Sequence, residues 1–288
     1  MANLKEIRSR IVSVSSTMQI TSAMKMVSAA KLKKAQDAIT AMRPYADTLT
    51  ELLQNLSGSI EDASGSVFAT ERPVEKVLLV AITSNRGLCG GFNSNIIKEV
   101  IAQRGNNYAG KQVDVFTIGK KGNDILSKDF FVADNRGDVF DDLTFANVSA
   151  VADQLMEHYA NGDYDRIDLV YNRFKNAATQ LVTTEQYLPI VPVEVETAST
   201  SDYIYEPAQE EIVSTLIPKA LKTQLFKALR DSFASEHGAR MTAMHKATDN
   251  ATELRDQLKL TYNKARQAAI TNETVSYTHL TLPTTRHV

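Results

Sequence analysis

The 288-residue sequence predicts an α/β protein with a long antiparallel coiled coil, in which a small α/β domain is inserted between two terminal shaft helices. Apolar residues recur with helical spacing in the first and last segments, whereas short β-rich runs fill the middle. Each terminal segment would extend roughly 80–95 Å as a helix, far more than a small domain of about 30 Å. An antiparallel pair of helices that projects beyond the inserted domain accommodates both lengths.

The N-terminal shaft helix is expected over residues 1–57. Apolar residues step by three and four at the start of this segment, which is typical of a coiled-coil seam: Leu4, Ile7, Ile11, Val14 and Met18. The seam continues less strictly through Met24, Val27, Leu32, Ile39, Leu49 and Leu53. Pro44 predicts a kink or a break in this helix. The stretch SGSIEDASGS (57–66) reads as a flexible loop, so we expect a linker over residues 58–72.

The α/β domain is expected over residues 73–207. Four runs are rich in β-forming residues and predict strands: VEKVLLVAIT (74–83), QVDVFTIG (112–119), RIDLVYNRF (166–174) and TQLVTTEQYLPIV (179–191). Two helical stretches lie between them, SNIIKEVIAQ (94–103) and FANVSAVADQLMEHYA (145–160). Strands that alternate with helices predict a parallel-rich sheet covered by helices.

The second shaft helix is expected over residues 208–273. Apolar residues recur every four at Ile217, Leu221, Leu225 and Leu229, and helical spacing continues through Met241, Met244, Thr248, Ala251 and Leu258. Gly238 is the one glycine of this run and predicts a close helix contact or a bend. We expect the stretch from Leu4 to Met24 to lie beside the stretch from Thr248 to Ile270.

A glycine-rich stretch, SNRGLCGGFN (84–93), separates a predicted strand from a predicted helix, the layout that cradles a phosphate in many enzymes. It lacks the lysine and hydroxyl of a P-loop and the G-x-G-x-x-G spacing of a dinucleotide site. We therefore expect a structural turn at Gly87, Gly90 and Gly91, with positive φ at a glycine and with Asn93 or Ser94 capping the helix. The later stretch GKKGNDIL (119–126) lacks the hydroxyl and glycine frame of a phosphate site.

No catalytic or metal-binding pattern is evident, so we expect no cofactor and no metal. His237 and His245 show no metal-ligand spacing and are expected at exposed helix positions. Cys89 is the one cysteine, which excludes an internal disulfide and fits a reducing compartment; an inert, packed thiol is the simplest expectation. No run of 18 apolar residues predicts a membrane span, and no secretory leader is evident.

Charge is segregated along the chain. Residues 1–57 and 211–273 carry net charges of +4 and +3, and residues 58–210 carry −10. The basic start has no interleaved aromatic residues, and the acidic middle would repel a phosphate backbone, so no nucleic-acid partner is expected. The basic ends are expected to meet an acidic partner or each other's flanks.

Three motifs, in order and at matching intervals, resemble the gamma subunits of F-type ATP synthases over about residues 1–273. They are ITSAMKMVSAAKLKKAQ (20–36), SNRGLCGGFN (84–93), and EHGARMTAMHKATDNATEL (236–254) followed by LTYNKARQAAITNE (260–273). The resemblance implies a non-catalytic central rotor, with the paired termini inserted in a ring of three alpha and three beta subunits. It implies a Rossmann-like domain at the foot of the shaft, without bound nucleotide, beside the epsilon subunit and the c-subunit ring.

The resemblance further implies that rotation of the c ring, driven by protons or sodium ions, changes the catalytic beta subunits in sequence. Contacts with the alpha and beta subunits are implied for Met24, Lys25, Met26, Arg240, Arg266, Gln267 and Thr271. Contacts of the foot with the c ring are implied for Tyr203, Tyr205 and Glu206. Such a subunit is peripheral, at the cytoplasmic face of the bacterial inner membrane, and meets the membrane only through its complex.

The last fifteen residues, TVSYTHLTLPTTRHV (274–288), depart from the family pattern: they are β-branched and contain Pro283. We expect this atypical tail, which could be non-native, to be non-helical. Two other functions stay open on composition alone. One is a dinucleotide- or phosphate-binding enzyme, which the missing fingerprints oppose. The other is a coiled-coil scaffold without a rotary role, which the three motifs oppose.

Overall fold

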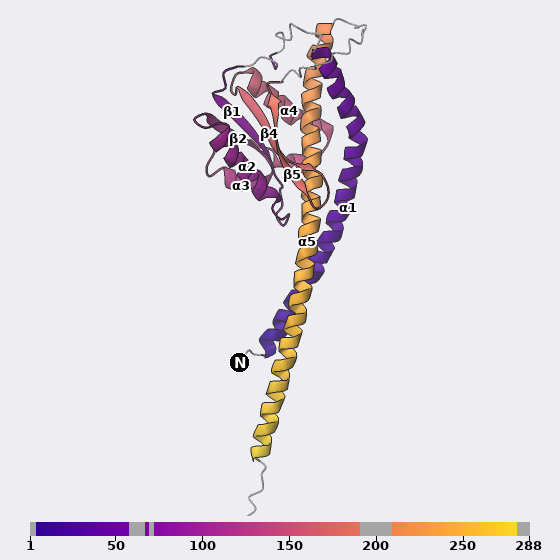
Figure 1. Ribbon diagram of the computed structural model, residues 1–288, viewed down its shortest axis with the longest axis vertical. Coiled ribbons are helices and arrows are strands. Elements are labelled where there is room, and N and C mark those ends of the chain that lie inside the picture. Colours follow the sequence, from indigo (N-terminus) through magenta and orange to yellow (C-terminus); the bar gives the residue numbers. More distant parts are fainter. Residues whose placement is uncertain (1–3, 58–66, 69–71, 191–208, 281–288) are drawn as a thin grey trace, which may run out of the picture. The chain divides into compact units, whose positions relative to one another are not determined.

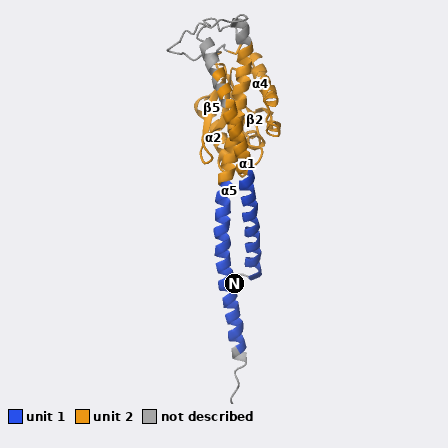
Figure 2. Cartoon of the chain, turned by 90° about the vertical axis from the view of Figure 1, so that its right-hand side faces the viewer, with its two compact units in different colours: residues 1–27, 243–288 blue, residues 28–242 orange. Residues whose placement is uncertain are grey.

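The structure is a computed structural model that describes residues 4–57, 67–68, 72–190 and 209–280. Contacts divide the chain into two compact units, residues 1–27 with 243–288 and residues 28–242 (Figure 2). The terminal helices α1 (Leu4–Ser57) and α5 (Gln209–Leu280) each contribute to both units. The predicted class, terminal helices with an inserted α/β domain, is therefore confirmed. None of the described helices is long and apolar enough to cross a membrane.

Unit 1 is an antiparallel pair made by the start of α1 and the last part of α5 (Figure 2). The hydroxyl of Thr248 donates to that of Thr21 at 2.8 Å, and the hydroxyl of Thr252 lies 3.3 Å from Sδ of Met18. Residue numbers thus fall along one helix as they rise along the other, which confirms the predicted pairing of these stretches. Ile7 is 5% exposed within this pair.

In unit 1, α5 continues past the beginning of α1 (Figure 2). The opposed pairs Thr21–Thr248 and Met18–Thr252 place Leu4 level with about Ala265, because paired straight helices advance equally. The final turns of α5, up to Leu280, therefore extend beyond the level of Leu4.

The structure contradicts a break of α1 at Pro44, whereas a kink there stays a prediction, and it contradicts the non-helical tail as far as Leu280. Helix α1 runs through Pro44, and Leu49 beyond it is only 6% exposed, so packing of the later turns offsets the missing proline hydrogen bond. Helix α5 continues from residue 274 to Leu280, where a non-helical tail was expected. β-branched residues lower helix propensity by only tenths of a kcal/mol each, which is too little to end a helix. The stronger breaker, Pro283, lies beyond Leu280, and residues 281–288 fall outside the described chain.

Unit 2 holds a five-stranded sheet with the order β3-β2-β1-β4-β5, the strand order of Rossmann folds (Figure 1). The strands are β1 (Lys76–Ile82), β2 (Gln112–Ile118), β3 (Val132–Asn135), β4 (Arg166–Phe174) and β5 (Gln180–Leu188). Strands β1 to β4 pair in parallel and β5 joins β4 antiparallel. The connecting helices are α2 (Phe92–Asn106), α3 (Lys120–Leu126), a 3₁₀ turn (Gly137–Phe140) and α4 (Phe145–Ala160).

Both faces of this sheet are buried, which explains the unbroken apolar run of β1. Leu78, Val80 and Ile82 pack in one core cluster with side chains of α4 and α5. Alternate β1 residues pack in a second cluster with side chains of α2 and α3. The predicted run Ile217, Leu221, Leu225 and Leu229 belongs to the first cluster, so this part of α5 covers the sheet.

Strand β3 and helix α3 were not predicted. The sequence of β3, VADN, is short and polar because this edge strand is only half buried. Helix α3, KKGNDIL, contains a glycine and spans only two turns. Neither carries enough apolar periodicity to stand out from a loop.

Candidate functional site

The glycine-rich turn lies where a Rossmann domain would bind its ligand. It follows β1, at the carboxyl ends of the parallel strands, where the strand order reverses between β1 and β4. The backbone has positive φ at Gly90 (59°), as the glycine turn required, and also at Leu88 (63°). Gly87 has no positive φ and has open space where a side chain would lie, so neither feature requires a glycine at this position.

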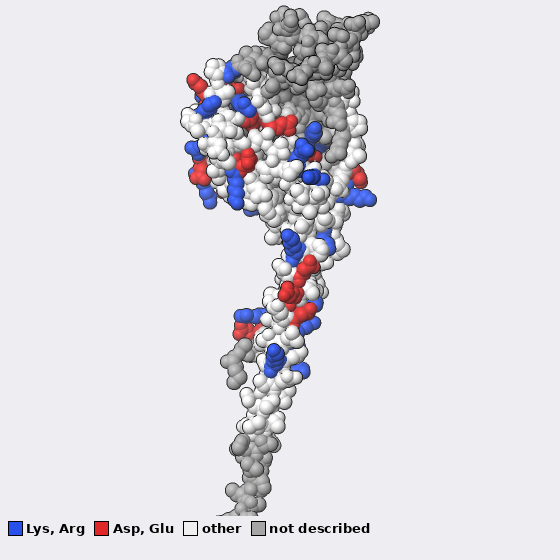
Figure 3. Space-filling view, in the orientation of Figure 1, with Lys and Arg blue, Asp and Glu red and all other residues white. Residues whose placement is uncertain are grey.

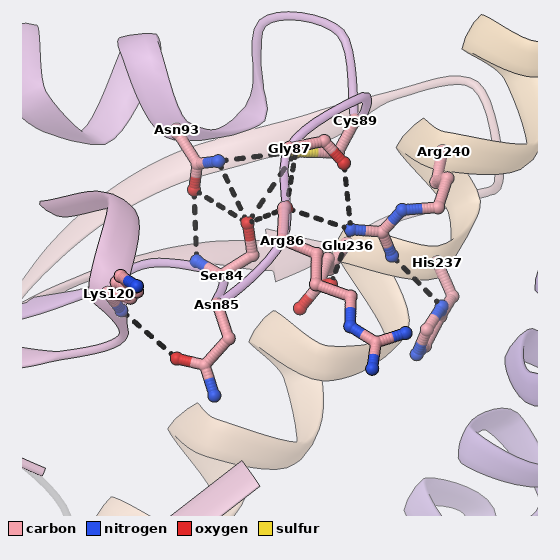
Figure 4. Close-up of polar contacts among 10 residues, drawn as sticks. All are labelled: Ser84, Asn85, Arg86, Gly87, Cys89, Asn93, Lys120, Glu236, His237 and Arg240. Carbon is pink, nitrogen blue, oxygen red and sulfur yellow. Dashed lines mark hydrogen bonds and ion pairs between the residues drawn. The ribbon is translucent and has the colours of Figure 1, made fainter. Parts of the chain in front are cut away.

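Side chains of the turn form hydrogen bonds with one another and with its backbone (Figure 4). The amide oxygen of Asn93 accepts from the backbone N–H of Ser84 at 2.9 Å, and the amide nitrogen of Asn93 lies 3.3 Å from Sγ of Cys89. Ser84 Oγ donates to the carbonyl of Arg86 at 2.7 Å. The expected helix cap is wrong, because Gly91 is the N-cap residue and Asn93 reaches back to the strand end instead.

One side chain of α5, Arg240, binds to the turn, and two neighbouring side chains of α5 contact Arg240 (Figure 4). The guanidinium of Arg240 donates to the carbonyls of Arg86 and Gly87 at 3.1 and 3.3 Å, and forms an ion pair with Glu236 at 2.7 Å. A second nitrogen of Arg240 lies 3.3 Å from Nδ1 of His237. Turn carbonyls thus face a protein cation where a nucleotide-binding turn would present its amides to a phosphate.

The second glycine stretch also bonds within the chain, in its case through its backbone donors. The N–H groups of Lys120, Lys121 and Gly122 donate to the Asn85 side chain, the Ser84 carbonyl and the Thr83 hydroxyl, respectively. Both stretches that resemble phosphate loops are therefore used within the chain, which supports the structural interpretation.

The electrostatics of this region follow from burial. Burial raises the pKa of the Cys89 thiol, while its hydrogen bond with Ser84 and the Arg240 charge lower that pKa. Burial also raises the pKa of Glu236, against the opposing effect of Arg240, and lowers the pKa of His237 to about 4. His237 is 5% exposed, so its expected exposed position is wrong, whereas His245 is exposed and paired with Asp249.

His237 can be assigned a tautomer. Arginine has only donors, so Nδ1 of His237 must accept from Arg240, and Nε2 must carry the proton. That Nε2 atom is buried and has no hydrogen-bond partner in the described chain. Groups of three or more metal-ligating side chains do not occur among the described residues either.

The structure separates the residues implied to contact alpha and beta subunits. Met24, Lys25 and Met26 lie on α1 in unit 1, where Met26 is 65% exposed. Three residues lie exposed on the final turns of α5: Arg266, Gln267 and Thr271. Arg240, by contrast, belongs to unit 2 and is only 7% exposed, with its donors used inside the chain. A partner contact of Arg240 stays a prediction.

The implied foot residues, Tyr203, Tyr205 and Glu206, lie outside the described residues. Figure 3 shows Lys, Arg, Asp and Glu interspersed over the inserted domain on the face drawn. The acidic excess of residues 58–210 therefore does not appear there as a field of one sign.

Sequence reasoning missed two polar contacts. Glu236 lies one helical turn before Arg240, and this i, i+4 spacing could have indicated their pairing. Thr248 was predicted on the seam of α5, but its partner Thr21 carries no apolar signal and was not predicted.

Comparisons with known proteins agree with this geometry. Residues 3–275 match the sequence family described as ATP synthase. The chain is 73% identical over 274 residues to the ATP synthase gamma chain of Flavobacterium johnsoniae, covering 95% of this chain and 96% of the relative. It is 47% identical over 277 residues to that of Geobacter metallireducens, with the same coverage.

Solved structures resemble the fold as well. The central stalk with c ring of the Tetrahymena thermophila mitochondrial ATP synthase includes a chain with a TM-score of 0.60 and 27% identity, covering 79% of this chain and 99% of that one. A rotor chain of the Euglena gracilis mitochondrial enzyme gives a TM-score of 0.68 at 22% identity, covering 93% and 98%, which supports the fold alone. With its antiparallel terminal helices and its inserted Rossmann-like domain, the chain belongs to the ATP synthase gamma-chain family.

Proposed function

We propose that this chain is the central rotor shaft of an F-type ATP synthase and has no catalytic site of its own. The observation that carries the proposal is the end of α5 in unit 1, which continues beyond α1 as an exposed helix. A helix of this kind, with Ile270 exposed by 54%, is stable in water only marginally. A surrounding sleeve of alpha and beta subunits would cover it.

The mechanism follows from asymmetry. Three identical beta subunits around one shaft meet different faces of it, so each is biased towards a different conformation. Because binding free energies are linked, a shaft that favours one conformation also changes the affinity of that subunit for nucleotide. Rotation of the shaft then moves each beta subunit through the same states in turn.

The sleeve contacts proposed are Met24, Lys25, Met26, Arg266, Gln267 and Thr271, all on unit 1. The side chains of Met26 and of the three residues on α5 are exposed, as partner contacts require. We place the foot contacts with the c ring and epsilon subunit at Tyr203, Tyr205 and Glu206, on family resemblance alone.

The complex is membrane-bound, and we propose that this chain is peripheral, at the cytoplasmic face of a bacterial inner membrane. The coupling ion, proton or sodium, is part of the same proposal and is set by the ring rather than by this chain. A nucleotide-binding role for the inserted domain is disfavoured because both glycine stretches use their polar groups internally.

The test is ATP hydrolysis by purified alpha and beta subunits, with and without this chain. Sustained stimulation that saturates at one chain per three beta subunits, with co-elution, would support the rotor function. A chain that ends at residue 273 serves as the matched control for the atypical tail. If neither version stimulates hydrolysis, the rotor function is excluded and a scaffold role is favoured.

A further inference from the structure

Arg240 is a charged side chain that unit 2 buries almost completely. It is 7% exposed, and its ion-pair partner Glu236 is 8% exposed. Removing both charges from water is costly, and apolar residues of similar size often give equal or greater stability. A buried pair of this kind therefore points to a positional task rather than to stability alone.

That task is visible in the contacts of the guanidinium (Figure 4). One nitrogen of Arg240 lies within 3.3 Å of two successive backbone carbonyls, those of Arg86 and Gly87. These carbonyls belong to a turn more than 150 residues away in sequence, between β1 and α2. Glu236, one helical turn earlier on α5, forms an ion pair with the same nitrogen at 2.7 Å.

Neighbouring contacts extend this attachment along α5. Ser235 Oγ donates to the carbonyl of Asn172 in β4 at 2.9 Å, and Thr242 Oγ1 donates to that of Ala177 after β4 at 3.2 Å. The stretch 235–242 of α5 is thus hydrogen-bonded to the ends of two adjacent strands. Apolar packing resists separation but has no preferred direction, whereas hydrogen bonds have defined angles and resist sliding and twisting.

We propose that Arg240 is a positioning residue that locks the glycine-rich turn onto α5, so that the inserted domain and this helix rotate together. The turn has kept the location of a phosphate loop but serves as the attachment point for the helix. The link to torque rests on the proposed rotor function, whereas the lock itself is a property of the isolated chain.

Cys89 provides a direct probe of the lock. It is the only cysteine in the chain, it lies within the turn, and it is 2% exposed. Opening of the turn would expose its thiol to a maleimide reagent. The rate of labelling in the purified full-length chain therefore measures local opening, and its dependence on low urea distinguishes local opening from global unfolding.

The variants are Arg240→Ala and Arg240→Lys, with Arg230→Ala as the matched control. Arg230 is a half-buried arginine of α5. Like Arg240 it donates to a loop carbonyl, that of Leu143 at 2.8 Å, but away from the turn. We expect labelling about tenfold faster, and independent of urea, in Arg240→Ala. Arg240→Lys should also be faster, because an ammonium has one nitrogen and lacks the second one that Arg240 places against His237. Arg230→Ala should label at the wild-type rate.

The torque half of the proposal is tested in the membrane-reconstituted complex. Arg240→Ala should lower the ratio of ions translocated to ATP hydrolysed about twofold, while Arg230→Ala keeps the wild-type ratio. Wild-type labelling in Arg240→Ala, or faster labelling that follows global unfolding, would overturn the lock. Faster labelling with an unchanged ratio would overturn its role in coupling. Failure of the wild-type chain to stimulate hydrolysis would instead exclude the rotor function and leave the labelling result standing.

Discussion

Burial sets the chemistry of His237, the residue on α5 whose ring contacts both Arg240 and Phe233. Burial, followed by the charges of Arg240 and Lys31, lowers its pKa from 6.5 to about 4. Its ring also packs edge-on against Phe233, with centroids 4.5 Å apart. The neutral ring is therefore built into the fold, and a proton on Nδ1 would point at a guanidinium.

This arrangement predicts a loss of stability in mild acid. Between pH 6.5 and 4 the unfolded chain binds a proton on His237 that the folded chain does not, so the free energy of unfolding falls as pH falls. From pH 7 to 4.5 the loss should be roughly 2–3 kcal/mol. Urea unfolding of the wild type and of His237→Gln, across this range, measures it.

The comparison with His237→Gln is needed because Glu236 changes the pH dependence of stability in the opposite direction. Its pKa is raised by burial, so its stabilising contribution is present at low pH and is lost as pH rises. Both proteins retain Glu236, and the difference between them reports on the imidazole. Parallel pH profiles for the two proteins would contradict the assignment.

Tyr187 is a second residue whose burial has a measurable effect. It is 1% exposed, and its hydroxyl has no hydrogen-bond partner among the described residues. Tyr187→Phe removes an unsatisfied polar group and keeps the ring, so we expect the free energy of unfolding to rise by about 1 kcal/mol. Tyr171→Phe, which removes a hydroxyl bonded to Glu185 at 2.9 Å, is the matched control and should destabilise. A loss of stability in Tyr187→Phe would indicate a bound water at this hydroxyl.

Among the elements, α5 meets the β4–β5 hairpin at Gly238. A side-chain carbon there would lie 3.2 Å from the carbonyl oxygen of Ala177 and 3.3 Å from its Cα. The hairpin cannot easily give way, because Asn176 and Thr179 exchange backbone hydrogen bonds across it. The close helix contact predicted from this glycine is confirmed.

Gly238→Ala should therefore destabilise the chain, although alanine favours a helix by about 1 kcal/mol. We expect a net loss of about 1 kcal/mol in urea unfolding, because tight overpacking against a rigid backbone exceeds the propensity gain. Ala247→Gly, on the half-buried side of the same helix, gives the propensity difference without this contact. A more stable Gly238→Ala would show that the hairpin adapts.

The helix seam shows where sequence patterns succeed and where they fail. Ile7, Leu32 and Ile39 were predicted to be buried and are, because large apolar side chains reveal a helix face directly. Val27 was predicted on the seam but is 58% exposed. The buried positions beside it are Thr21 and Ser28, spaced seven residues apart, which an apolar pattern does not register.

Some features of the inserted domain could likewise be predicted from the sequence and others could not. Its strongly apolar strands and its Rossmann-like class could be predicted, and so could a turn with positive φ at a glycine, Gly90. The contact between Arg240 and that turn could not, because it joins residues more than 150 positions apart and depends on the packing of α5. Long-range polar contacts leave no periodic signal in one sequence.

At the scale of the whole molecule, α5 takes part in both proposed roles, the attachment of the glycine-rich turn in unit 2 and the contact with the alpha–beta ring in unit 1. It is one continuous helix from Gln209 to Leu280, so a twist applied to its part in unit 2 is carried along the same backbone. Its first part covers the sheet, and its last part is exposed to a partner. The two ends can therefore be altered independently, because they belong to separate compact units.

The exposed end gives the final prediction. Replacing Arg266, Gln267 and Thr271 together by alanine should leave the stability of the isolated chain within about 0.5 kcal/mol, because all three side chains are exposed. Loss of three polar contacts should weaken binding to the alpha–beta ring roughly ten- to a hundredfold, which titration of the stimulated ATP hydrolysis would measure. The control replaces Gln257, Lys259 and Thr261 by alanine, exposed polar residues of α5 where it still runs beside α1. Equal loss in both triple variants would show that the sleeve grips the shaft along its length, and wild-type binding in the first would place the contact elsewhere.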